Sequence, residues 1–248
     1  MDAERSLKWY KKLQEINMRR DSGYFMVEGL NAVNQVCAVA PSAIIEILYT
    51  EEVPLQLSKY QTRFVRPAKL AEILTSKTPQ GIAALVKAPQ DIYDPLLPTK
   101  LGSKVLLLDG VSNPGNTGTL IRSASALSFD GVVLTVDGCD VLAPKVVAAS
   151  AGALFSLWLK RVFDVSWTIN YFKQNGFTVV GTALKGQNDS SVLKAEKLLL
   201  VLGNEARGLS PQTIASCDYT LCLPIDNTKA ESLNVATAGS ICMYLANH

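Results

Sequence analysis

The stretch KVLLLDGVSNPGNTGTLIRSASALSFDGVVL, residues 104–134, decides the fold. The apolar run at 105–108 predicts a buried strand, and the polar turn NPGN at 113–116 ends it. A helical pattern of small residues follows at 119–127, and a second apolar run begins at Val132. This order of strand, turn, helix and strand predicts a unit of a parallel sheet, which presents polar groups at its carboxyl edge.

Two polar residues stand out in this stretch. Asn116 lies in the turn, and Arg122 follows it among small and apolar residues. Asn116 fits the N-cap of the helix, and Arg122 fits a cation whose stem crosses apolar surface to reach solvent. The alternative is that both residues belong to a binding or catalytic site, and this stretch alone does not separate the two interpretations.

The remaining apolar runs predict the architecture. Residues 103–248 alternate apolar runs with helical stretches, which predicts an α/β domain built on a mostly parallel sheet with helices on both faces. Residues 1–88 predict a smaller α/β domain, and residues 89–102 contain three prolines without periodicity and predict a linker. The expected strands lie at 24–29, 43–49, 82–86, 104–109, 131–136, 178–184, 197–202 and 219–223. The expected N-terminal helices lie at 3–18, from the end of the strand at 24–29 to about residue 40, and at 69–74.

Composition excludes several classes of protein. The 24 basic and 22 acidic residues give a net charge of +2, so any nucleic-acid contact must come from a local basic patch. Five cysteines without a CxxC pair favour reduced thiols in the cytoplasm, and the lone histidine, His248, disfavours a metal site and histidine catalysis. The charged N-terminus and the lack of a long apolar segment predict neither a signal peptide nor a membrane span. We therefore expect a soluble cytoplasmic protein.

Two more polar clusters follow predicted strands. In LLLVLGNEARGLS, residues 198–210, Gly203 at the strand end allows a ligand to approach the backbone, although for this motif alone a tight turn with an acidic helix N-terminus is the favoured explanation. In the segment 223–239, Ser232 fits an N-cap, whereas Asn234 has no predicted capping role. All three clusters follow strands, which predicts a ligand site at the carboxyl edge of the sheet. The glycines around residue 110 do not match GxGxxG, which disfavours a dinucleotide enzyme.

The three clusters resemble the ordered motifs of the SpoU/TrmH branch of the SPOUT RNA methyltransferases. The matching segments are NxxxxxR at 116–122, LGNEARGLS at 202–210, and LP followed by SLNVA within 223–236. This resemblance covers residues 104–248. The segments FMVEG and KTPQG also resemble the L30e-like substrate-binding domain that many members carry before the catalytic domain.

The resemblance implies a trefoil knot in the C-terminal domain, S-adenosylmethionine as cofactor and a homodimer formed through the knotted domain. It implies that the cofactor is held by Thr182, Leu202, Gly203, Leu223, Ile225, Ser232 and Leu233. It implies that the catalytic site is formed by Asn116, Arg122, Glu205, Ser232 and Asn234. No metal ion is expected.

The resemblance further implies methyl transfer to a ribose 2′-hydroxyl in structured RNA, with ribosomal RNA favoured over transfer RNA. A guanidinium stays protonated at neutral pH, so we expect Arg122 to stabilise negative charge and to grip a phosphate. Base methylation, a transfer-RNA substrate and a catalytically silent RNA-binding module are the alternatives. The candidate RNA contacts are Lys11, Lys12, Arg19, Arg20 and Arg122, although the N-terminal cations also fit a solvated helix face.

Overall fold

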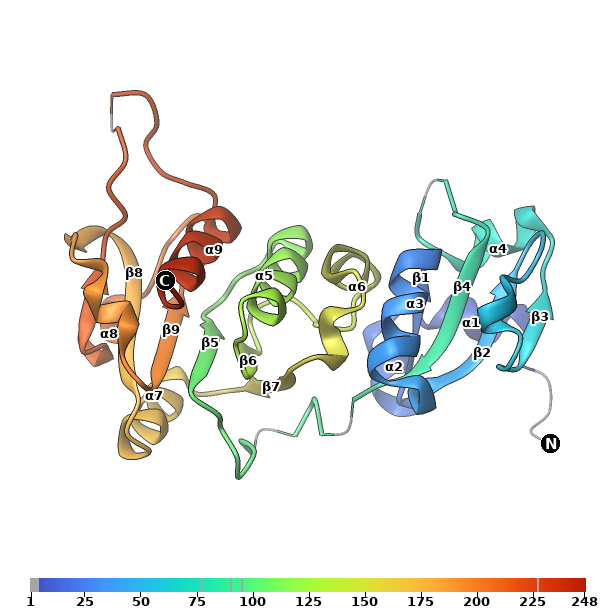
Figure 1. Cartoon of the computed structure of the whole chain (residues 1–248), viewed down its shortest axis with the longest axis horizontal. Helices are drawn as coiled ribbons and strands as arrows, with labels where there is room; N and C mark the ends of the chain where they lie inside the picture. Colours follow the sequence, from blue (N-terminus) through green and yellow to red (C-terminus); the bar gives the residue numbers. More distant parts are fainter. Residues whose placement is uncertain (1–4, 77, 90, 95, 227) are drawn as a thin grey trace.

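The structure is a computed structural model that describes residues 5–248 except 77, 90, 95 and 227 (Figure 1). Two β-sheets organise the chain, one in the N-terminal part and one in the C-terminal part. Figure 1 shows these two parts side by side along the long axis of the molecule. This arrangement confirms the predicted α/β fold class.

The N-terminal sheet has four strands in the order β1-β4-β2-β3, and only the β2–β3 pair is parallel. In β1, alternate residues point to opposite faces: Phe25 and Val27 pack in the same core as α3, and Met26 packs in the same core as α1 and α4. The strands are β1 (Tyr24–Glu28), β2 (Ile44–Tyr49), β3 (Thr62–Phe64) and β4 (Ile82–Lys87). The helices are α1 (Leu7–Lys12), α2 (Ile16–Ser22), α3 (Leu30–Val39) and α4 (Pro67–Ile73), with 3₁₀ turns at Pro41–Ala43 and Leu55–Leu57.

The predicted single helix at 3–18 is wrong. The chain breaks between α1 and α2, where Arg19 turns back and donates from Nη1 to the carbonyl oxygens of Leu13 and Gln14, at 2.8 and 2.7 Å. These bonds satisfy carbonyl groups that a continuous helix would have bonded internally. Helical periodicity alone therefore overestimated the length of this helix.

The C-terminal sheet has six strands in the order β10-β8-β9-β5-β6-β7, and every neighbouring pair is parallel. Its central strands are almost entirely apolar, as expected for strands that are covered on both faces. The strands are β5 (Lys104–Leu108), β6 (Gly131–Thr135), β7 (Trp158–Val162), β8 (Thr178–Gln187), β9 (Leu198–Leu202) and β10 (Tyr219–Leu221). The mostly parallel sheet is confirmed.

Helices cover both faces of this sheet. One face packs against α5 (Pro114–Ala126), α6 (Pro144–Ser150) and α9 (Val235–Leu245), and the other against α7 (Val165–Gln174) and α8 (Pro211–Ser216). The 3₁₀ turns lie at Ala153–Phe155 and Ser190–Lys194. Sequence analysis missed β7, whose WLKRV run contains two charged residues. Both are buried, since Lys160 donates to the carbonyl of Asp91 and Arg161 to that of Val136. The short edge strand β3 was also missed.

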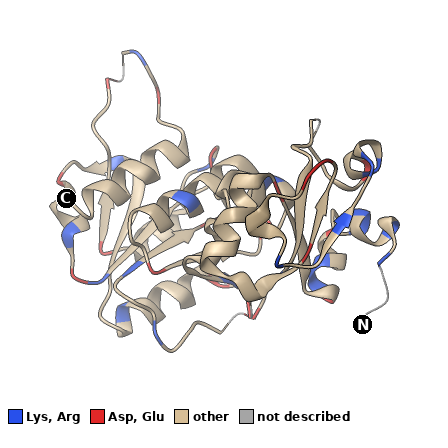
Figure 2. Ribbon diagram, turned by 45° about the vertical axis from the view of Figure 1, so that its right-hand side comes forward, with Lys and Arg blue, Asp and Glu red and all other residues tan. Residues whose placement is uncertain are grey.

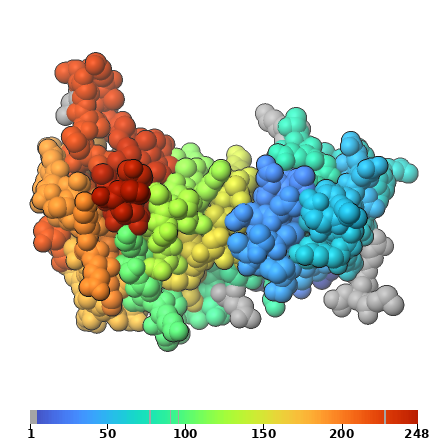
Figure 3. Space-filling view, viewed as in Figure 1, coloured from blue at the N-terminus to red at the C-terminus, as the bar shows by residue number. Residues whose placement is uncertain are grey.

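The two parts share one hydrophobic core. Phe25 of β1 stacks on Phe155, which follows α6, with ring centroids 6.2 Å apart. Beside this contact, Arg19 of α2 forms an ion pair with Asp140, which lies between β6 and α6, at 2.6 Å. Tyr93 of the connecting segment donates to the other carboxylate oxygen at 2.8 Å. Figure 3 shows the N-terminal part seated against the yellow segment that contains α6.

Candidate functional site

Helix α5 begins at Pro114, about one turn before the start that Asn116 as N-cap would give. Asn113 is its N-cap, because its side chain accepts from the backbone N–H groups of Gly115 and Asn116 at 2.8 and 3.3 Å. Asn116 therefore lies inside the first turn, and the alternative that it caps the helix is wrong. The N-cap followed by Pro114 is a signal that sequence analysis had not used. The Asn116 side chain is left free to face the neighbouring loops.

A chain of hydrogen bonds joins the three sequence motifs. The Oδ1 atom of Asn116 accepts from Asn234 at 3.0 Å, and its Nδ2 atom donates to Glu205 at 3.0 Å. Glu205 also accepts from the backbone N–H groups of Asn113 and Ser112 at 2.9 and 3.1 Å, and from the Ser112 hydroxyl at 3.1 Å. The ends of β5 and β9 and the start of α9 are thus fixed to one another.

Asn234 has a capping role as well, contrary to the sequence prediction. Its side chain accepts from the backbone N–H groups of Ala236 and Thr237 at 2.8 and 3.3 Å, which makes it the N-cap of α9. The predicted N-cap, Ser232, lies exposed in the preceding loop. Asn234 therefore fixes the start of α9 and bonds Asn116 with the same amide group.

The carboxylate of Glu205 is stabilised in its charged form. Burial alone would raise its pKa, but hydrogen bonds from Asn116, Asn113 and Ser112 outweigh burial and lower the pKa to about 2. Glu205 is therefore an ionised acceptor at neutral pH. An ionised carboxylate that already accepts several bonds holds loops in place better than it abstracts a proton.

The folded-state pKa of Glu205, about 2, is below its ordinary value of 4.5, so the charged form favours the folded state. We expect Glu205→Gln to be less stable than the wild type by a constant margin above pH 4.5, and this margin to shrink as the pH falls toward about 2. Urea unfolding of both proteins across this acid range measures it. Glu196→Gln, at an exposed position, is the control. A margin that does not depend on pH would contradict the assignment.

Arg122 is exposed on α5, and it forms no hydrogen bond or ion pair with any residue that the structure describes. This contrasts with the asparagine and glutamate side chains nearby, whose partners are within the protein. An exposed guanidinium without such a partner can bind an anionic group of a ligand through paired N–H donors.

The residues expected to hold a cofactor lie within β8, at the end of β9 and on the segment that follows β10. Thr182 donates to the carbonyl of Val201 at 3.4 Å, and Leu202 and Gly203 are buried at the end of β9. A Cβ atom on Gly203 would lie 2.3 Å from the carbonyl carbon of Gly208, so this turn has no room for a side chain. Leu223, Ile225, Ser232 and Leu233 lie on the segment between β10 and α9, which projects from the C-terminal part in Figure 1.

Free backbone donors accompany these residues. The N–H groups of Gly203, Leu223 and Ile225 have no hydrogen-bond partner among residues 5–248 as described. Gly203 is buried, so its unpaired N–H is costly unless a ligand accepts from it. Apolar side chains and free backbone donors on neighbouring segments are typical of a site for a small heterocyclic ligand.

The predicted RNA contacts divide into two groups. Lys11, Lys12 and Arg20 are exposed on α1 and α2, and Figure 2 shows blue residues on these N-terminal helices. Arg19 is only 3% exposed, and its guanidinium is held by Asp140 and by backbone carbonyls. A side chain that is enclosed in this way does not reach a ligand, so the prediction for Arg19 is wrong. Arg20 instead stacks over Tyr93, 4.9 Å from the ring centroid.

Sequence analysis missed two further residues of the site. Asn204 donates to the carbonyl of Gly110 at 2.8 Å and accepts from the N–H of Ala206 at 3.0 Å, which shapes the turn before Glu205. Asp109 accepts from Thr213 at 2.9 Å.

Within the described residues, no group of three or more His, Cys, Asp and Glu side chains is placed to hold a metal ion. None of the described helices is long and apolar enough to cross a membrane.

The fold and the site define an α/β protein that binds a small ligand at the carboxyl edge of a parallel sheet. The chain belongs to the SpoU rRNA methylase family, whose model matches residues 103–244. A second model, described as RNA 2′-O ribose methyltransferase substrate binding, matches residues 26–92.

Individual relatives are similar over nearly the whole chain. A 23S rRNA (guanosine(2553)-2′-O)-methyltransferase, RlmP of Bacillus subtilis, is 32% identical over 244 residues, covering 96% of this chain and 94% of the relative. The crystal structure of the SpoU methyltransferase AviRb from Streptomyces viridochromogenes, in complex with the cofactor AdoMet, has a TM-score of 0.83 and 28% identity, covering 98% and 97% of the two chains. The AdoMet-bound rRNA methyltransferase from Sinorhizobium meliloti has a TM-score of 0.82 and 25% identity, covering 97% and 93%.

Proposed function

We propose that this protein transfers a methyl group from S-adenosylmethionine to a ribose 2′-hydroxyl of ribosomal RNA in the cytoplasm. The observation that carries the proposal is the hydrogen-bonded network of Asn116, Glu205 and Asn234, together with the exposed guanidinium of Arg122 on the same helix, which has no hydrogen bond or ion pair among the described residues. Relatives named as 23S rRNA 2′-O-methyltransferases support the substrate, and neighbours solved with AdoMet support the cofactor.

The residues on β8, at the end of β9 and after β10 fit S-adenosylmethionine. The free N–H groups of Gly203, Leu223 and Ile225 would bind the polar edge of the adenine, and the side chain of Leu233 would cover an apolar face. The Leu202 side chain is buried against Gly239 of α9, so Leu202 would support the site from below. Thr182 lies on the neighbouring strand β8, and we assign its hydroxyl to the same ligand. We also assign Ser232, on the segment between β10 and α9, to this ligand. The cofactor supplies a methyl group on a sulfonium, which needs no metal ion to react.

The chain's own residues then have to position the ribose and balance charge. Arg122 binds the phosphate next to the target nucleotide and stabilises the negative charge that develops on the 2′-oxygen. It does not act as a base, because a guanidinium stays protonated at neutral pH. Asn116 and Asn234 hold the loops around the ribose through their bonds to each other and to Glu205. Orientation of this kind lowers the entropic part of the barrier.

We assign substrate recognition to residues 1–88 and methyl transfer to residues 103–248, with residues 89–102 as the connection. The exposed cations Lys11, Lys12 and Arg20 give the N-terminal part a basic surface for RNA phosphates. An anisotropy titration with a labelled ribosomal RNA fragment, with all three changed to alanine, tests this surface. Binding that is unchanged in the triple variant would contradict the assignment.

We further propose that the C-terminal part forms a trefoil knot and a homodimer. Helix α9 supports the dimer, because Ile241 and Tyr244 are 39% and 53% exposed and line a groove with Thr119 of α5. Apolar side chains on an exposed helix face are typical of an interface. Light scattering should return twice the mass of one chain, and a monomer at micromolar concentration would contradict the dimer.

A substitution at Gly203 tests the cofactor site. We expect Gly203→Ala to weaken S-adenosylmethionine binding about tenfold or more, because the new Cβ atom displaces the backbone at Gly208. Calorimetric titration measures the affinity. Gly176→Ala is the control: it lies in the turn before β8, where its positive φ of 82° strains an alanine but the Cβ atom has space. Equal losses in both variants would indicate general destabilisation.

A further inference from the structure

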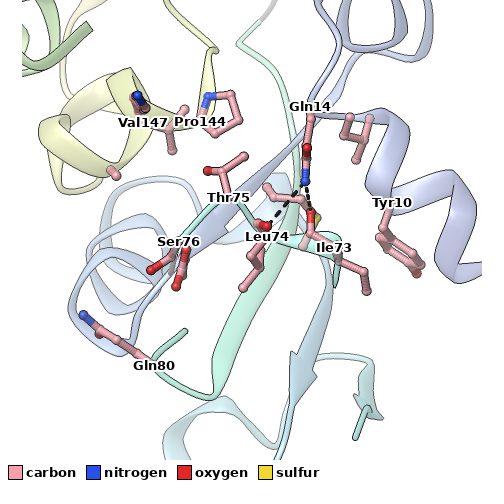
Figure 4. A pocket seen from close by; sticks show the side chains of 14 residues that line it. Tyr10, Gln14, Ile73, Leu74, Thr75, Ser76, Gln80, Pro144 and Val147 are labelled. Carbon is pink, nitrogen blue, oxygen red and sulfur yellow. Dashed lines mark hydrogen bonds between the residues drawn. The ribbon is translucent and has the colours of Figure 1, made fainter. Parts of the chain in front are cut away.

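A cavity of about 320 Å³ lies between the two parts of the molecule, apart from the polar network described above. Figure 4 shows its lining: Gln14, between α1 and α2, and the segment Ile73–Ser76 face Pro144 and Val147 of α6 across the cavity. Gln14 donates to the carbonyl of Ile73 at 2.8 Å, which fixes this wall.

The same ion pair that joins the two parts also holds both walls of the cavity. Arg19 bonds the carbonyls of Leu13 and Gln14 on one side, and on the other side it binds Asp140, which precedes α6. The contacts that hold the N-terminal and C-terminal parts together therefore also hold the two walls of the cavity in place. A site whose walls are fixed in this way binds a ligand without first having to be ordered.

The size and surface of the cavity suit one flat aromatic group. Ligand pockets begin at roughly 300 Å³, so this volume holds a single base and no helical segment. Met26, Leu74 and Val147 contribute apolar walls from both parts. Polar groups lie at the rim and on one side, where Glu28 at the end of β1 is accompanied by Ser76 and Gln80.

Glu28 and Lys145 give the cavity its charge. Glu28 is half-buried, and burial raises its pKa although the Gln80 backbone and the Ser76 hydroxyl lower it in part. Lys145 of α6 is exposed at the opposite wall, and it has no hydrogen bond or ion pair within the described part of the chain. An acceptor group at one side and a free cation at the other match a base attached to a phosphate.

We propose that this cavity binds an unpaired guanine of the RNA substrate, with the Glu28 carboxylate accepting hydrogen bonds from N1–H and the N2 amino group and with Lys145 contacting the phosphate. An ionised carboxylate only accepts hydrogen bonds, and guanine is the base whose Watson–Crick edge presents two adjacent donors. Adenine and cytosine place a ring acceptor beside their amino group, and uracil places carbonyls on both sides of its single N–H. The proposal rests on the proposed function, since it names how the RNA is read.

Saturation-transfer NMR with GMP, AMP, CMP and UMP tests this assignment on the full chain. Saturating S-adenosylhomocysteine keeps the nucleotides out of the cofactor site. We expect GMP to bind preferentially and Glu28→Gln to weaken its binding about tenfold, because the amide replaces an acceptor with a donor. The control Glu52→Gln, at an exposed loop position of the same part, should bind GMP like the wild type. Ala148→Trp, which fills the cavity from the exposed face of α6, should also abolish the preference for GMP.

Equal binding of the four nucleotides, or unchanged GMP binding in Glu28→Gln and Ala148→Trp, would overturn the proposal. Calorimetric titration of the same proteins with S-adenosylmethionine, in the absence of S-adenosylhomocysteine and of nucleotides, separates this failure from failure of the proposed function. If the wild type binds the cofactor but not GMP, only the proposal of a guanine site is contradicted. If the wild type does not bind S-adenosylmethionine, the methyltransferase assignment is contradicted instead. Wild-type cofactor affinity in both variants shows that they are folded.

Discussion

Arg122→Ala is expected to lower the rate of methyl transfer about a thousandfold while S-adenosylmethionine affinity stays within about twofold of the wild type. The reason is geometric. Arg122 has no hydrogen bond or ion pair among the described residues, so its removal breaks no polar interaction there, whereas the residues that we assign to the cofactor lie on β8, at the end of β9 and after β10. The measurement pairs a radiolabelled methyl-transfer assay on unmodified ribosomal RNA with a calorimetric titration of the cofactor.

Arg122→Lys sharpens this experiment. Lysine keeps the positive charge but loses the planar pair of donors, so a role in gripping a phosphate predicts an intermediate rate, closer to alanine than to arginine. A general-base role predicts instead that lysine, whose pKa lies lower, restores activity at alkaline pH. Cofactor affinity that falls in parallel with activity in Arg122→Ala would show that the guanidinium belongs to the cofactor site.

Much of the C-terminal fold could be predicted because its strands are buried on both faces. Runs such as LLLVL at 198–202 are apolar along their whole length, and their order with the intervening helices predicts a parallel sheet. The positions of Asn116, Glu205 and Asn234 after strands also predicted a common edge. That they bond one another directly could not be predicted, since the bonds depend on side-chain directions that no sequence spacing fixes.

Where prediction failed, a polar residue had a hydrogen-bond partner that the sequence pattern did not indicate. Asn234 looked free of a capping role because the serine before it fits the N-cap preference equally well, and only the backbone path selects the asparagine. In β7, Lys160 and Arg161 interrupt the apolar pattern, yet both are buried by bonds to carbonyls. Arg19 failed for the same reason: on a helix wheel it belongs to the basic face, and its partner Asp140 lies 121 residues away.

Because Arg19 is buried, its substitution is expected to have a large effect on the stability of the protein. We expect Arg19→Ala to lower the free energy of unfolding by about 3–5 kcal/mol, because it leaves the Asp140 carboxylate buried without a cation. It also removes the donors to the carbonyls of Leu13 and Gln14. Differential scanning calorimetry should show a midpoint lower by roughly 10 °C. Arg20→Ala is the matched control, because it removes an exposed cation next in sequence that only stacks over Tyr93.

A double-mutant cycle decides whether the effect comes from the ion pair. In Arg19→Ala/Asp140→Ala the unpaired charge is gone, so the loss should be well below the sum of the two single losses. If Arg19 mattered only as a surface cation for RNA, Arg19→Ala and Arg20→Ala would have equal stability and would weaken RNA binding equally. The pair joins the part with the basic surface to the part with the catalytic network. A stability loss should therefore be accompanied by a higher KM for RNA, while cofactor affinity stays unchanged, because docking sets where the bound RNA meets Arg122.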